Sequence, residues 1–162
     1  MIKGISYKPI GIIHSPFKSA QGTPIQPKSA KGIKGSIVLE KEYTEGLKDL
    51  GEFSYIILLF HFHLSSGYSL RVKPYMDDNL HGVFATRAPR RPNSIGLSVV
   101  RLLKIKENIL EIEDVDIVDG TPLLDIKPYV PDFDVREVER IGWFKNNIQK
   151  LNKMKDDGRF VK

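Results

Sequence analysis

Residues 82–98 combine three arginines with two prolines, a composition that could hold anions. Arg87, Arg90 and Arg91 lie in or beside the segment APRRPN, whose prolines prevent regular structure. A proline-stiffened loop presents guanidinium groups in fixed orientations, and their paired N–H groups match phosphate or carboxylate oxygens. The alternative is an exposed connection whose arginines are solvated. The density of arginine in one short stretch favours a functional loop.

A second stretch, residues 116–129 (DIVDGTPLLDIKPY), contains a turn with several hydrogen-bonding groups. Gly120 permits close approach of the backbone to a ligand, and Asp119 and Thr121 carry side-chain oxygens beside it. The alternative is a tight turn before an edge strand. Both stretches are therefore candidates for ligand binding.

His61 and His63 stand two residues apart in an apolar segment, so in a strand they would point to the same face. Metalloenzymes of the cupin type combine such a pair with a third histidine and a carboxylate. Here the next acidic residue is Asp77. A metal site is thus the weaker interpretation, and no metal is expected. We favour an arrangement in which one histidine lines a pocket and the other is a core residue whose hydrogen bonds are satisfied.

Several classes of protein are excluded by what the sequence lacks. It contains no cysteine, which excludes disulfides, zinc ribbons, iron–sulfur clusters and thiol catalysis. It also lacks the phosphate-binding Walker loop, the dinucleotide-binding glycine motif, the nucleophile elbow and the zinc-protease helix motif. A doubly wound nucleotide-binding domain is therefore not expected.

The net charge of +5 is modest, but the charges are segregated along the chain. Residues 1–39, starting with Lys3, and residues 82–106 carry basic residues and no acidic one, whereas residues 107–126 carry acidic residues and no basic one. Basic stretches attract polyanions by releasing counterions. The alternative is a solvated surface on which strands of opposite sign lie side by side. The charge pattern permits a nucleic-acid partner without demonstrating one.

Short apolar segments separated by turn-forming residues predict a mainly β protein. Strands are expected at residues 8–14, 35–40, 53–64, 82–88, 96–105, 109–115 and 123–130. The strand at 53–64 is apolar on both faces, as in a central strand, and Pro128 suggests an edge position for the last strand. Residues 15–34 form a long loop rich in proline, glycine and serine, which is typical of a functional segment.

Two helices complete the predicted fold. Glu42 to Leu50 is the first, and Arg136 to Met154 is an amphipathic C-terminal helix, because its apolar residues recur at helical spacing. The expected fold is a small antiparallel β-barrel with one short helix and a C-terminal helix. Residues 1–131 would form the barrel, and residues 132–162 a C-terminal helical extension of the same domain.

The length of 162 residues and the hydrophobic content of 41% indicate one folded domain. The longest purely apolar run, residues 55–60, is far shorter than the roughly 20 residues that a membrane span needs. The N-terminal residues have no apolar stretch typical of a secretory signal. We therefore expect a cytoplasmic protein with no membrane partner.

Together these stretches resemble the TsaA-like family, the tRNA N6-threonylcarbamoyladenosine methyltransferases also called TrmO. The most specific matches are the arginine-proline segment and the DGTPLLDIKPY segment, which occur in the same order. The matching segments are PIGIIHSPFK (9–18), PIQP (24–27), LLFHFHLS (58–65), GVFATRAPRRPNSIGLS (82–98) and DIVDGTPLLDIKPYVP (116–131).

This resemblance implies a small β-barrel that forms a homodimer and binds S-adenosylmethionine near the subunit interface. It also implies methyl transfer to N6 of threonylcarbamoyladenosine, beside the anticodon in the anticodon loop of tRNA. The donor-binding residues implied by the matching motifs are Pro24, Ile25, Gln26, His63, Leu64, Arg87, Leu97, Asp119, Gly120, Thr121 and Pro122.

Two positions depart from the family pattern. Ile25 stands where family members often have arginine, so a backbone contact is expected there, and Leu64 replaces a polar residue. Arg90 and Arg91 are assigned by chemistry to the substrate side, where they would hold the threonyl carboxylate or a phosphate. No residue is identified as the acceptor of the N6 proton, so the catalytic residues are unassigned.

A non-catalytic, basic RNA-binding β-barrel is the main alternative. It explains the basic loops, but it gives residues 24–26 and the turn at Gly120 no role. The sequence also lacks the aromatic clusters on which proteins that bind single-stranded nucleic acid stack the bases. A cupin-like metalloenzyme is the second alternative.

Overall fold

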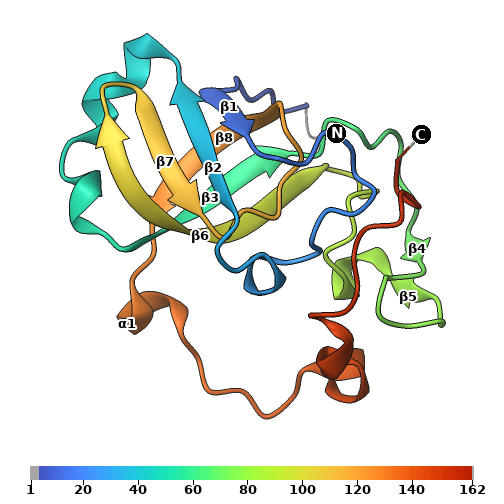
Figure 1. Ribbon diagram of the computed structural model, residues 1–162. Helices are drawn as coiled ribbons and strands as arrows, with labels where there is room; N and C mark the ends of the chain where they lie inside the picture. Colours follow the sequence, from blue (N-terminus) through green and yellow to red (C-terminus); the bar gives the residue numbers. More distant parts are fainter. Residues whose placement is uncertain (1–3, 162) are drawn as a thin grey trace.

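Six antiparallel strands close into a barrel, which occupies the upper left of Figure 1. The computed structural model describes residues 4–161, so Lys3 of the predicted basic run lies outside the described residues. The barrel strands are β1 (Gly11–His14), β2 (Lys34–Leu39), β3 (Tyr55–His61), β6 (Ile95–Lys106), β7 (Ile109–Glu113) and β8 (Thr121–Pro128). Their order is β1-β2-β7-β6-β3-β8, and pairing of β1 with β8 closes the barrel. The predicted antiparallel β-barrel is confirmed.

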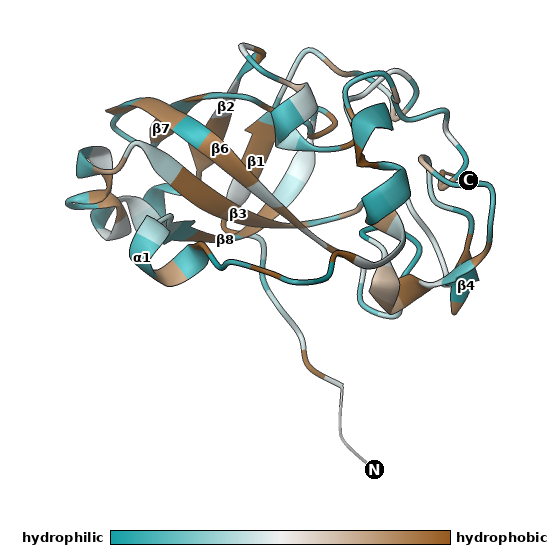
Figure 2. Ribbon diagram, turned by 90° about the horizontal axis from the view of Figure 1, so that it is seen from below, coloured by the Kyte–Doolittle hydropathy of each residue, from teal (hydrophilic) through white to brown (hydrophobic). Residues whose placement is uncertain are grey.

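Alternation of side chains along the strands fills the barrel interior. Ile56 and Leu58 of β3 and Val100 of β6 are fully buried, whereas the residues between them are partly exposed. Because neighbouring residues of a strand point to opposite faces, one apolar set packs inside the barrel. Figure 2 shows these strands as the most hydrophobic ribbons of the molecule. The prediction that the strand at 53–64 is buried on both faces is wrong, because its outer face is only half-buried.

Gly96 of β6 is needed for the packing of this barrel. It pairs with Phe60 of β3, and a Cβ atom built on Gly96 would collide with the Phe60 ring. The glycine therefore lets a large ring lie across the neighbouring strand at the end of the barrel where β3 ends and β6 begins.

The acidic strand β7 lies between two basic strands. Glu113 is opposite Lys34 of β2 and Arg101 of β6, and Glu111 is opposite Lys104. The Arg101 guanidinium lies 3.7 Å from the Glu113 carboxylate. The interpretation of strands of opposite sign lying side by side is thus confirmed for this part of the chain. Arg101 and Lys104 of β6 thus each lie beside an acidic residue of β7.

Two strand predictions are wrong. Only Gly82 of the segment 82–88 is in a strand, because β5 (His81–Gly82) gives way to a 3-10 turn, η4 (Val83–Ala85). Val83 is buried outside the barrel, and Thr86 donates its hydroxyl to the Val83 carbonyl at 2.8 Å, which curls the chain. The last strand, β8, is not an edge strand, since it pairs with both β1 and β3; Pro128 sits at its end.

The predicted helices are also replaced by tighter turns. Residues 42–50 contain the 3-10 helix η2 (Lys41–Leu47), followed by η3 (Leu50–Glu52). The C-terminal helix predicted at 136–154 is absent, and that segment contains only η5 (Gly142–Asn146) and η6 (Ile148–Lys150) after the short α1 (Pro131–Asp134). Gly142 has a φ of +60°, which breaks a right-handed helix. Trp143 donates to the Ala85 carbonyl at 2.8 Å and stacks on His81, so tertiary contacts override the helical spacing.

Three of the segments outside the barrel gather at one side of it. They comprise the loop with η1 (Pro27–Ser29), the two-stranded ribbon of β4 (Arg71–Val72) and β5, and the C-terminal segment, which returns beside that ribbon in Figure 1. The division at residue 131 between a barrel and an extension stays a prediction. Within residues 4–161, every helix is too short or too polar to cross a lipid bilayer.

Candidate functional site

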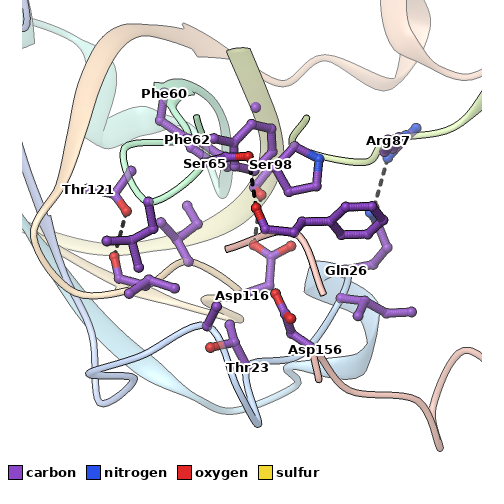
Figure 3. Close-up of a pocket in the computed structure, with 18 of the residues that line it drawn as sticks. Thr23, Gln26, Phe60, Phe62, Ser65, Arg87, Ser98, Asp116, Thr121 and Asp156 are labelled. Carbon is purple, nitrogen blue, oxygen red and sulfur yellow. Dashed lines mark hydrogen bonds between the residues drawn. The ribbon is translucent and has the colours of Figure 1, made fainter. Parts of the chain in front are cut away.

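A cavity of about 310 Å³ lies where β3 ends and where β6 and β8 begin. Its walls come from the loop at residues 20–26, the ends of these strands, the arginine-proline loop and the C-terminal residues 156–161. Figure 3 shows side chains from these separate segments pointing into one space. The cavity is therefore built by long-range contacts at one end of the barrel.

The loop at residues 20–26 is held in place by the C-terminal segment. Gly22 N–H donates to the Asp156 carbonyl at 2.7 Å, and Asp156 N–H donates to the Thr23 carbonyl at 2.9 Å. Pro24 and Lys155 form an isolated antiparallel bridge in the same place. This pairing fixes residues 24–26 against the cavity without a regular strand.

Most of the predicted site residues line this cavity. They come from four segments far apart in the sequence: Pro24, Ile25, Gln26, His63, Leu64, Arg87, Arg91, Leu97 and Thr121. The four that do not line it are Arg90, Asp119, Gly120 and Pro122. The first group is a coherent candidate site, and the second group needs separate explanations.

Asp119 faces β1 and the chain after it. Its carboxylate accepts hydrogen bonds from Ser15 N–H at 3.0 Å and from the Lys18 ammonium at 2.7 Å, and it lies 3.1 Å from His14 Nδ1. These bonds, the one from Lys18 first, lower the pKa of Asp119 to about 2. Gly120 has a φ of +79°, and no atom lies within 4 Å of a Cβ built there. The glycine is explained by its backbone conformation, and Asp119 anchors the turn that leads into β8.

Gln26 and Arg87 separate this cavity from a second, more apolar one. The Arg87 guanidinium donates to the Gln26 side-chain oxygen at 2.8 Å, and both residues line the two cavities (Figure 3). The second cavity has a volume of about 600 Å³ and is lined in part by Trp143 and Phe144 of the C-terminal segment. Arg87 thus lies at a junction, with its charge bound to a neutral partner.

The neighbouring arginines of the proline-bounded loop have different surroundings. Arg91 donates from one guanidinium nitrogen to the backbone carbonyls of Thr86 at 3.0 Å and Ala88 at 3.2 Å. It braces its own loop while lining the cavity. Arg90 faces a different hollow. The two arginines therefore line different spaces, and their substrate-side role stays a prediction.

Asp116 is a cavity residue that the sequence analysis did not select. Its carboxylate accepts a hydrogen bond from the buried Ser98 hydroxyl at 2.7 Å, as Figure 3 shows. Burial raises the pKa of Asp116 to about 7, although the Ser98 bond acts in the opposite direction. The one available signal was Ser98 itself, a polar residue at an inward position of an apolar strand.

Asp156, from the C-terminal segment, is a second carboxyl group in the cavity that was not among the predicted site residues. Burial also raises its pKa. Within residues 4–161, neither Asp116 nor Asp156 forms a salt bridge, and the cavity arginines Arg87 and Arg91 are bound to other partners. Two carboxyl groups without a bound cation, beside the rings of the cavity wall, suit a cationic ligand that carries a flat ring.

His63 lies beyond the end of β3, and its hydrogen bonding defines its protonation. Its Nδ1 is 3.3 Å from the Thr121 hydroxyl, whose only hydrogen is donated to the Val118 carbonyl at 2.7 Å. The Thr121 oxygen therefore accepts from His63 Nδ1–H, and Nε2 is left with a lone pair. Partial burial and the nearby His61 lower the pKa of His63, which keeps the ring neutral at pH 7. Within residues 4–161, no group of three potential metal-ligating side chains occurs.

Comparison with known proteins matches this arrangement to one family. The family model for the N-terminal domain of tRNA-methyltransferase O matches residues 12–135. A protein of Pyrococcus abyssi named a probable S-adenosyl-L-methionine-binding protein is 63% identical over 96% of this chain and 85% of its own length. A mouse tRNA (adenine(37)-N6)-methyltransferase is 37% identical over 78% of this chain, which spans 31% of the mouse protein.

A solved structure supports the same relationship. The crystal structure of TrmO from Pseudomonas aeruginosa superposes with a TM-score of 0.73 at 40% identity, covering 87% of this chain and 63% of that chain. This chain thus spans less than two thirds of the bacterial structure. The residues matched by the family model, 12–135, include the barrel strands from Ile12 onward and the arginine-proline loop. The chain therefore belongs to the TsaA-like family, whose defining domain is the N-terminal domain of tRNA-methyltransferase O.

Proposed function

We propose that this protein uses S-adenosylmethionine to methylate N6 of threonylcarbamoyladenosine, next to the anticodon of tRNA. The observation that carries the proposal is the convergence of residues 24–26, His63, Arg87, Leu97 and Thr121 on one cavity at the end of the barrel. These segments carried the family resemblance and are separated by up to about a hundred positions. Their convergence supports a common ligand.

The groups that line the cavity suit the proposed donor. When bound, S-adenosylmethionine supplies a methyl group on a positively charged sulfonium, together with an amino group and an adenine ring. Asp116 and Asp156 offer carboxyl groups to positive charge, and Phe60 and Phe62, whose ring centroids are 5.3 Å apart, form an aromatic wall. Much of the catalysis would consist of positioning donor and acceptor in line.

His63 is the proposed acceptor of the N6 proton. The urea-like N6 nitrogen is a weak nucleophile and gains from losing its proton as the new N–C bond forms. A neutral imidazole with Nδ1–H bound to Thr121 leaves Nε2 to take that proton. Thr121 would hold the ring in this tautomer, which gives the first residue of β8 a positioning role.

The remaining donor-site residues have distinct proposed roles. Gln26 and Arg87 form the boundary with the apolar cavity, and Pro24, Ile25, Leu64 and Leu97 provide apolar walls. Asp119, Gly120 and Pro122 would act indirectly, by shaping the turn that presents Thr121. We further propose that the protein works in the cytoplasm and as a homodimer.

Two measurements test the proposal. Calorimetric titration with S-adenosylmethionine, in the presence of a chelator, should give a binding isotherm. Incubation with tRNA that carries threonylcarbamoyladenosine should give the N6-methylated nucleoside in a mass spectrum of the digested RNA, and unmodified tRNA should give none. Donor binding without any methylated product would favour the alternative of a non-catalytic RNA-binding barrel. Absence of donor binding would overturn the assignment of the cavity.

A further inference from the structure

Five basic side chains surround a second polar hollow, which we call the cationic cleft. It lies beside the ribbon of β4 and β5, has a volume of about 650 Å³ and is lined by Arg71, Lys73, Arg90, Lys150 and Arg159. These residues come from three separate parts of the sequence, so no single charged stretch of the chain reveals the cleft. Folding gathers the positive charge there.

The acidic residues of the cationic cleft do not neutralise it. Asp77 lies 2.8 Å from His81 Nε2, and Asp78 lies 3.1 Å from Lys73 Nζ. Asp157 pairs with Arg159. Among the residues that the structure describes, Arg71, Arg90 and Lys150 have no carboxylate partner. The Lys150 ammonium donates to the Asn147 side-chain oxygen at 2.7 Å and to the Met76 carbonyl at 3.2 Å, and both of these partners are neutral. The cleft therefore has three positive charges that no carboxylate neutralises.

Arg90 carries a hydrogen-bond donor that the fold itself does not use. Its Nε atom is enclosed, and it has no hydrogen-bond partner within residues 4–161. A buried donor without an acceptor is costly, and an unobserved ion or ligand is one of its standard explanations. The neighbouring Arg91 gives the contrast, since its guanidinium is bound to the Thr86 and Ala88 carbonyls. Arg91 therefore stabilises the loop itself, whereas the side chain of Arg90 is available to bind a ligand.

The cationic cleft adjoins the donor cavity. Tyr75 and Phe160 line both spaces, with their ring centroids 5.2 Å apart in an edge-to-face arrangement. Arg159 lies over the Tyr75 ring at 5.0 Å from its centroid. An anion in the cleft would thus be separated from the proposed methyl donor by a single aromatic wall.

We propose that the cationic cleft binds a backbone phosphate of the substrate tRNA, with Arg90 as the central contact and Arg71 and Lys150 beside it. Guanidinium groups match phosphate oxygens in geometry and keep their charge at all working pH values. The proximity of the cleft to the cavity means that a phosphate held there would fix the position of a nearby nucleotide. This inference rests on the proposed function, because it takes the tRNA substrate from it.

The experiment compares Arg90→Gln with a matched control, Lys48→Gln. Lys48 is exposed and directly follows η2, and the segment around residues 41–52 lies on the side of the barrel away from β4 in Figure 1. Binding of tRNA is measured by fluorescence anisotropy over a series of salt concentrations. For Arg90→Gln we expect at least about tenfold weaker binding and a log–log salt slope smaller by about one unit, the size of one phosphate contact. Lys48→Gln should match the wild type, and donor affinity should be unchanged in both variants.

A second variant, Lys150→Gln, covers the case in which Arg90→Gln fails to fold. It should weaken tRNA binding and reduce the salt slope in the same direction. Equal affinity and equal slope for the wild type and for the folded cleft variants would overturn the proposal. The assay needs no methyl transfer, so the two proposals fail separately. If the wild type fails to methylate tRNA but the cleft variants still bind tRNA more weakly, the proposed function alone is contradicted. If the wild type methylates tRNA but the cleft variants bind it as tightly as the wild type does, the role of the cleft alone is contradicted.

Discussion

Replacing Asp116 by asparagine should make the protein more stable at pH 8, relative to the wild type, than at pH 5. Burial raises the pKa of Asp116 from the usual 3.8 to about 7. The folded state thus holds the proton more tightly than the unfolded state. The stability that this carboxyl contributes is complete below pH 4 and is lost as the pH rises towards 7. A difference of about three pKa units corresponds to a contribution of at most about 4 kcal/mol to the free energy of unfolding.

About two of these three units lie between pH 5 and the folded pKa of about 7, so the difference between pH 5 and pH 8 is at most about 3 kcal/mol, and we expect about 2 kcal/mol. The assay is urea unfolding of the wild type and Asp116→Asn at pH 5 and pH 8. All other titrating groups are common to both proteins, so they cancel in the difference. Ser98→Ala is the control, because the Ser98 hydrogen bond lowers the pKa of Asp116 and its loss should steepen the pH dependence. Identical pH dependence in the wild type and Asp116→Asn would refute the reasoning.

Three further predictions address packing, catalysis and assembly. Gly96→Ala should destabilise the fold by about 1–3 kcal/mol in urea unfolding, because its Cβ meets the Phe60 ring, whereas Gly46→Ala, in open space, should be close to neutral. His63→Gln should lower kcat about 100-fold with little change in donor affinity, and the fall in rate at acid pH should disappear from its pH profile; a retained acid limb would count against His63 as the proton acceptor. Light scattering should report a dimer at micromolar concentration, and a mass of 18.4 kDa would contradict the proposed homodimer.

The six barrel strands were predictable because they are short apolar runs separated by turn-forming residues. Ile56, Leu58 and Val100 lie in apolar runs that end at turn-forming residues, and the hairpin between β6 and β7 turns at Glu107, close to where the charged and polar residues indicated it. The helix at 136–154 was not predictable in this way. Its apolar spacing is helical, but Trp143 binds the Ala85 carbonyl and Gly142 takes a positive φ, and both depend on the folded environment.

Prediction of the site from the sequence was limited in the same way. The family motifs identified segments whose residues line one cavity, but Asp116 and Asp156 were missed, because their importance comes from burial and not from a motif. Arg90 and Arg91 could not be distinguished, since the direction of adjacent side chains depends on how the loop folds. Sequence patterns found the segments, whereas the three-dimensional path of each loop decides which space each side chain enters.

The closure of the barrel through β1 and β8 limits how this protein can associate with others. An open sheet can recruit another chain by adding a strand to its edge, but a closed barrel offers no such row of unpaired backbone groups. Within the described residues, the ribbon of β4 and β5, two residues in each strand, is the other paired sheet. A second copy or an RNA must therefore be recognised by side chains and loops. The choice of partner thus depends on surface side chains and loops, which can change without disturbing the backbone hydrogen bonds of the barrel.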